Sequence, residues 1–135
     1  MELLNYKIYS ETNNISFTKP ILVFLHGFGG NSCIWLKQIK PLKKEFDLLL
    51  IDLPSHGKSK VLLSEMNKTF ESIVDKIIEV LDYLHIKKAT FIGCSLGTMF
   101  VKYIVVKKRE LVDKFILIGG IVVYNNWLKF GIQLS

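Results

Sequence analysis

FIGCSLGT, residues 91–98, places a serine between two glycines directly after a short apolar run. The run Ala89–Gly93 is typical of a buried strand, and a helical pattern begins at Leu96. A residue between such a strand and a helix lies where open α/β sheets form their clefts. The turn strains its central residue, and side chains at Gly93 and Gly97 would collide with the adjoining helix and strand. Ser95 is therefore a candidate nucleophile.

Outward from this turn, apolar runs alternate with helical patterns. The runs that predict buried strands are 21–25, 46–53, 89–93 and 114–118, with a weaker edge strand at 6–9. The patterns that predict helices are 32–42, which Pro41 should disturb, 70–84, and 96–108. This alternation predicts an α/β fold with right-handed crossovers, a mostly parallel sheet and helices on both faces.

Composition narrows the class of protein. A chain of 135 residues, half of them hydrophobic, suits one domain with a real core. The uncharged stretch 115–128 is broken by two glycines and two asparagines, so we expect no membrane span. The N-terminus lacks a basic region before an apolar core, which argues against a signal peptide. Two cysteines, Cys33 and Cys94, cannot build a disulfide framework, and we expect a cytoplasmic protein.

The net charge of +6 gives no strong indication of a partner. Acidic residues separate most of the basic groups, and no interleaved aromatic pattern supports nucleic-acid binding. We therefore expect no nucleic-acid partner, although a basic binding surface is kept as a minor alternative. No metal-ligand spacing and no phosphate-binding glycine loop occur, so we expect no metal and no cofactor.

Two further stretches end at the same edge of the predicted sheet. HGFGG (26–30) follows the strand 21–25, and DLPSHGKS (52–59) follows the second strand. With GCSLG, they make the chain resemble the N-terminal half of the α/β-hydrolase family over almost its whole length. DLPSHGKS resembles the family's D-x-P-G-H-G-x-S loop, with Ser55 where glycine is usual, which should alter that turn.

The resemblance implies acyl transfer on a small-molecule ester or related acyl substrate. Ser95 would be the nucleophile, and the backbone N–H groups of Phe28 and Leu96 would form the oxyanion hole. The residues that would support these loops are His26, Gly27, Gly93 and Gly97. Beside Ser95, Cys94 could be a reactive thiol, but a small residue that only packs is the simpler interpretation.

The resemblance also raises the question of the base. In this family the chain order is serine, then acid, then histidine, yet no histidine follows Ser95. Glu110 and Asp113 precede the last predicted strand, at the wrong end of the sheet. We expect His26 to hold its loop and His85 to be exposed at the opposite end. His56, at the right edge, is the least implausible substitute, although the resemblance makes it structural.

We therefore hypothesise a truncated or split hydrolase, inactive alone. Residues 1–120 would be the N-terminal half of the core, and 121–135 the start of a cap. The strand 114–118 would be left as a bare sheet edge. This edge allows self-association, or pairing with a missing C-terminal half. The alternative function is a non-catalytic remnant that acts as an interaction protein through the same edge.

Overall fold

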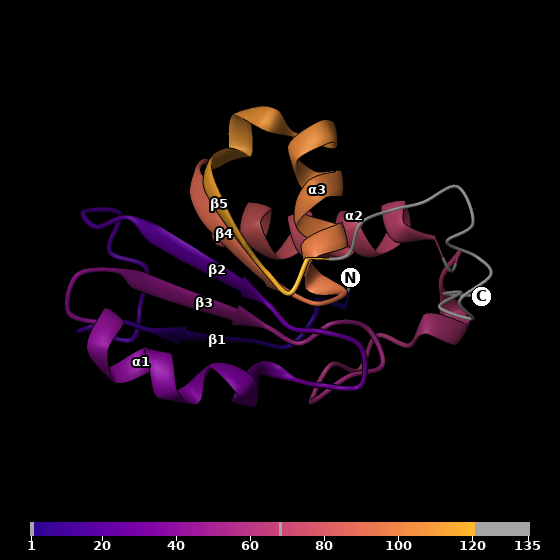
Figure 1. Ribbon diagram of the computed structural model, residues 1–135, viewed down its shortest axis with the longest axis horizontal. Helices are drawn as coiled ribbons and strands as arrows, with labels where there is room; N and C mark the ends of the chain where they lie inside the picture. Colours follow the sequence, from indigo (N-terminus) through magenta and orange to yellow (C-terminus); the bar gives the residue numbers. More distant parts are fainter. Residues whose placement is uncertain (1, 68, 121–135) are drawn as a thin grey trace.

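Five strands form a single sheet in the order β1-β3-β2-β4-β5 in the computed structural model, which describes residues 2–67 and 69–120 (Figure 1). The strands are β1 (Tyr6–Tyr9), β2 (Ile21–Leu25), β3 (Asp47–Ile51), β4 (Ala89–Cys94) and β5 (Val112–Ile118). The helices are α1 (Leu36–Leu42), α2 (Phe70–Tyr83) and α3 (Gly97–Lys107). Strands β2 to β5 pair in parallel, and β1 pairs antiparallel with β3 at one edge. The predicted mostly parallel α/β sheet is confirmed.

Element boundaries differ from the predictions by a few residues. The predicted strand 46–53 is shorter in the structure, where β3 spans Asp47–Ile51. The residues after Ile51 form a hydrogen-bonded loop instead. Strand β5 begins earlier, at Val112, so Asp113 lies inside it rather than before it. The predicted helix 32–42 is a 3₁₀ turn over Ser32–Trp35 followed by α1, which ends one residue after Pro41.

The sheet is covered on both faces, as the apolar runs require. Alternate residues of each strand point to opposite faces. One face packs under α1 and contains Leu22, Phe24, Leu48, Leu50 and Ile92, together with Trp35 and Ile39. The other packs under α2 and α3 and contains Val23, Leu25, Leu49, Ile51 and Phe91 among a larger cluster. Figure 1 shows α1 on one side of the sheet and α2 with α3 on the other.

The order of the strands creates a switch point between β2 and β4. From β2 the chain passes through α1 to β3 on one side, and then through α2 to β4 on the other side of β2. Because the connections leave on opposite faces, a crevice opens at the carboxyl ends of these two strands. The register pairs Leu25 with Gly93, so the loops after β2 and β4 begin side by side.

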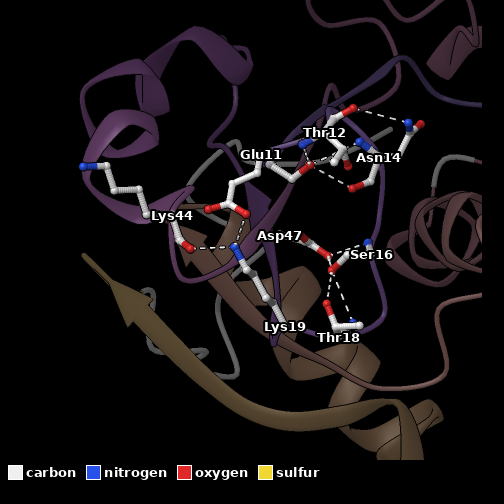
Figure 2. A network of polar contacts seen from close by, with 9 residues as sticks. Glu11, Thr12, Asn14, Ser16, Thr18, Lys19, Lys44 and Asp47 are labelled. Carbon is white, nitrogen blue, oxygen red and sulfur yellow. Dashed lines mark hydrogen bonds and ion pairs between the residues drawn. The ribbon is translucent and has the colours of Figure 1, made fainter.

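A polar network lies at the amino end of the sheet, away from that crevice (Figure 2). The buried carboxylate of Asp47, at the start of β3, accepts 2.7 Å hydrogen bonds from the backbone N–H and hydroxyl of Ser16. Lys19 pairs with Glu11 at 3.0 Å and donates to the Lys44 carbonyl at 2.6 Å. These contacts fasten the β1–β2 connection to the chain around β3.

Two further predictions concern the carboxyl-terminal residues and a membrane span. The division at residue 120 and the cap start at 121–135 stay predictions, because 121–135 lie outside the described residues. Over 2–67 and 69–120, no helix has the length and apolar character needed to cross a bilayer.

Candidate functional site

Ser95 stands on the turn between β4 and α3 with its side chain exposed. Its backbone is left-handed, with φ of 53°, a conformation that costs a non-glycine residue about 1 kcal/mol or more. Neighbouring hydrogen bonds hold it there. The Ser95 N–H donates to the Ile118 carbonyl at 2.9 Å, and the Ser95 carbonyl accepts from the Thr98 N–H at 3.0 Å and the Thr98 hydroxyl at 2.6 Å. The serine is thus presented at the crevice by a strained but well-tied turn.

The two flanking glycines leave no room for a side chain. A Cβ on Gly93 would lie 2.7 Å from the Gly97 carbonyl oxygen. A Cβ on Gly97 would overlap the Leu25 carbonyl oxygen at the end of β2. Helix α3 therefore begins in direct contact with the backbone of β2 and β4, which fixes its first turn beneath Ser95.

The loop 26–30 packs directly against the serine. A Cβ on Gly27 would lie 3.2 Å from the Ser95 Cβ and 3.7 Å from its Oγ. Within the described ranges, the backbone N–H groups of Phe28 and Leu96 have no hydrogen-bond acceptor. Each belongs to a residue adjoining this contact. In the described part of the chain, two free donors therefore adjoin the contact between Gly27 and Ser95.

His26 holds the loop with both ring nitrogens. Its Nδ1 donates to the Gly27 carbonyl at 2.7 Å, and its Nε2 accepts from the Leu53 N–H at 3.0 Å. Both contacts are satisfied by the neutral ring with its proton on Nδ1. The side chain is fully buried, and this burial is the main reason that its pKa lies below the ordinary value. Neither nitrogen is free to take a proton from Ser95.

His56 is engaged in the same way. Its Nε2 accepts from the Gly29 N–H at 2.8 Å, and its Nδ1 donates to the Pro54 carbonyl at 2.8 Å. The expected exposed position of His85 is found, after α2 and before the amino end of β4. In the described part of the chain, Ser95 Oγ forms no hydrogen bond with any histidine.

Sequence reasoning missed Asp52, which organises the loop 52–59. Its buried carboxylate accepts from the Ser32 N–H at 2.8 Å, the Asn5 amide at 2.8 Å and the Lys58 N–H at 3.0 Å. Burial alone would raise the pKa of Asp52, but the hydrogen bonds from Lys58, Ser32 and Asn5 outweigh it and lower the pKa. The sequence did contain a signal for this role, because Asp52 and Gly57 stand in the same short loop. Gly57 has φ of 52°, and a Cβ there would overlap the carboxylate.

The remaining candidates lie apart from Ser95. Glu110 and Asp113 stand at the amino end of β5, whereas Ser95 follows the carboxyl end of the parallel strand β4. Cys94 is partly buried at the end of β4. Among the residues that the structure describes, no three His, Cys, Asp or Glu side chains gather as a metal site would require.

Known proteins resemble this chain in sequence. A sequence profile described as the alpha/beta hydrolase fold matches residues 20–134. The pimeloyl-[acyl-carrier protein] methyl ester esterase of Wigglesworthia glossinidia brevipalpis is 37% identical over 99 residues, covering 73% of this chain and 36% of that protein. The strigolactone esterase RMS3 of Pisum sativum is 29% identical over 101 residues, covering 73% and 38%.

A solved structure shares the fold. MGS-M2, described as an alpha/beta hydrolase enzyme from a Medee basin deep-sea metagenome library, matches with a TM-score of 0.83 at 20% identity. The match covers 94% of this chain and 44% of that one. The chain thus spans less than half the length of each of these three proteins.

Proposed function

Because this chain belongs to the α/β-hydrolase fold family, we propose that it carries the nucleophile-bearing part of a serine hydrolase acting on a carboxylic ester or related acyl substrate. The observation that carries the proposal is the exposed, left-handed Ser95 packed against Gly27. Beside it, the N–H groups of Phe28 and Leu96 have no acceptor among the residues that the structure describes. The esterase names of two relatives support the substrate class.

The proposed reaction is acyl transfer through Ser95. The Oγ forms a bond to the substrate carbonyl carbon while its proton passes to a base, and the carbonyl oxygen becomes an oxyanion. The N–H groups of Phe28 and Leu96 would hold that oxyanion, and losing one such donor typically costs about 3 kcal/mol of barrier. The N-terminus of α3 adds a favourable dipole. Collapse expels the alkoxide, which takes the proton back from the base, and water then releases the acyl group.

The base of this reaction would come from outside the 135 residues. Both ring nitrogens of His26 and His56 serve backbone partners, and His85 lies at the other end of the sheet. The relatives extend well beyond the matched region. We infer that the histidine and its acid belong to a carboxyl-terminal half, in the same polypeptide or in a paired one, and that these residues alone are inactive.

A non-catalytic role is the second candidate, and the free edge of β5 favours it. Within the described residues, β5 pairs with β4 on one side and with no strand on the other. Phe115, Ile116 and Ile118 are about half exposed there. Unpaired apolar edge strands are sites of association. A remnant that binds a related hydrolase or itself would use this edge.

The free thiols bear on where the protein works. Cys33 is exposed and Cys94 partly buried, and neither is in a disulfide. Free cysteines fit a reducing compartment. We therefore propose a cytoplasmic location, which fractionation of the source cells would test.

Chemical rescue tests the proposed function. Purified chain is mixed with p-nitrophenyl acetate, with and without exogenous imidazole as a substitute base. We expect turnover above that of imidazole alone, abolished in Ser95→Ala and retained in Cys94→Ala, which changes the neighbouring nucleophile. Turnover without imidazole would contradict the missing base, and equal rescue of Ser95→Ala would contradict the nucleophile. Absent rescue combined with a concentration-dependent size that Ile116→Lys abolishes would favour the interaction protein.

A further inference from the structure

His56 connects two loops, and its hydrogen bond to Gly29 joins residues 27 positions apart in the chain. Its Nε2 accepts the Gly29 N–H of the loop 26–30, while its Nδ1 donates to the Pro54 carbonyl of its own loop, both at 2.8 Å. An amide N–H can only donate and a carbonyl can only accept. The two contacts therefore require the neutral ring with its proton on Nδ1, and a second proton on Nε2 would face the Gly29 N–H and break the bridge.

The ring also packs against the loop that it holds. The Phe28 ring meets the His56 ring edge-on, with centroids 5.1 Å apart at 74°. Such a T-shaped pair adds to the hydrogen bond. Phe28 is otherwise exposed, at 63%, so little else restrains its side chain.

The loop tip has few other supports. Gly29 has φ of 78°, and a Cβ placed there would meet no atom within 4 Å. Inside the loop, the Gly30 N–H donates to the Gly27 carbonyl at 3.2 Å. Because Gly27 lies against Ser95, a shift at Gly29 would carry the Phe28 N–H between them away from the serine.

We propose that His56 is a positioning residue, which holds the Phe28 N–H in place for the oxyanion through its neutral-ring bridge to Gly29. This inference rests on the proposed function only for the role of Phe28; the bridge itself is independent of it.

Other ionisable groups face the same region. The His26 ring centroid lies 5.3 Å from that of His56. Asp52 lies beneath Gly57, and the Lys58 side chain is exposed two residues away. His26 has its own reporter, because its Nε2 accepts the Leu53 N–H at 3.0 Å. The two histidines can thus be followed separately by the amides of Gly29 and Leu53.

The test is an amide proton–nitrogen correlation spectrum of the full chain at pH 8. In His56→Gln, whose side-chain oxygen can replace Nε2 as the acceptor, the Gly29 signal should stay near its wild-type position. In His56→Leu the Gly29 signal should shift, while the Leu53 signal, which reports on His26, should not. In His56→Leu, the Gly29 amide should exchange with solvent about tenfold faster at pH 8. His85→Gln is the matched control and should behave as wild type.

Imidazole-rescued turnover links the bridge to the chemistry. We expect His56→Leu to lower kcat by at least about tenfold with KM little changed, and His56→Gln to restore kcat. A Gly29 amide that exchanges as slowly in His56→Leu as in wild type, or unchanged kcat in a folded His56→Leu chain, would overturn the proposal. If wild type shows no Ser95-dependent turnover but Gly29 follows His56, the bridge stands and the proposed function fails.

Discussion

Ser55 shows how one residue can replace the glycine usual at a strained position. Its φ is 59°, in the left-handed region that glycine adopts freely. Its hydroxyl accepts from the Leu63 N–H at 2.8 Å, and its own N–H donates to the Val61 carbonyl at 2.9 Å. The strain and the extra hydrogen bond are both worth about 1 kcal/mol and oppose each other. The Ser55 turn is thus tied by hydrogen bonds to residues 61–63.

Asp52 carries a prediction at the same scale. Asp52→Asn should lower the free energy of unfolding by about 2 kcal/mol at pH 7, because it removes charge-assisted hydrogen bonds from Ser32 and Lys58. The folded pKa is lowered, so this contribution is complete above the ordinary carboxyl value of 3.8 and is lost as the pH falls through the lower folded value. Urea denaturation at several pH values measures it. A gap between wild type and variant that already closes between pH 7 and pH 5 would contradict this account.

At the scale of elements, the contact of α3 with β2 and β4 decides the position of the turn that carries Ser95. Gly97→Ala should lower the free energy of unfolding by about 3 kcal/mol, because the new methyl group would overlap the backbone carbonyl of Leu25. Chemical denaturation of the variant measures this. Gly120→Ala is the matched control, since a Cβ there meets no atom within 4 Å. Equal effects of the two substitutions would show that α3 can move away from β2 at little cost.

Elements were also the level at which sequence reasoning succeeded best. Fully buried runs such as 21–25 carry their own signal, because a strand covered on both faces must be apolar throughout. The predicted ends of the helices and strands were less accurate. Asp52 leaves β3 because its carboxylate accepts from three donors, in Asn5, Ser32 and Lys58. Two of these donors lie far away in the sequence. The same applies to the neutral ring of His56, which depends on a single amide of another loop.

For the whole molecule, buried neutral histidine predicts sensitivity to mild acid. The lowered pKa of His26 means that the unfolded chain binds a proton more readily than the folded one as the pH falls below the ordinary value of 6.5. Stability should therefore fall with decreasing pH there, by up to about 1.4 kcal/mol per unit. Urea denaturation at pH 7.5, 6.5 and 5.5 measures the slope. His26→Gln should reduce it, whereas an undiminished slope would assign the effect to other groups.

The parallel direction of β2, β3 and β4 explains why the position of the site could be predicted from the sequence while its contacts could not. The loops after β2, β3 and β4 all emerge at one edge because those strands are parallel. Motifs that follow strands must therefore meet, whatever their distance along the chain. The contacts among them could not be predicted, since the partners of Gly27, Leu53 and Gly29 depend on details of packing.

The hydrogen bond from the Ser95 N–H to the Ile118 carbonyl, 2.9 Å long, also sets an order of events on the ribosome. The turn that strains the serine is made from residues 93–97, yet one of its ties is supplied by the last residue of β5. Chains emerge from the ribosome amino end first. During synthesis the turn therefore gains this hydrogen bond only after residue 118 has left the exit tunnel, and a nascent chain halted earlier would lack it.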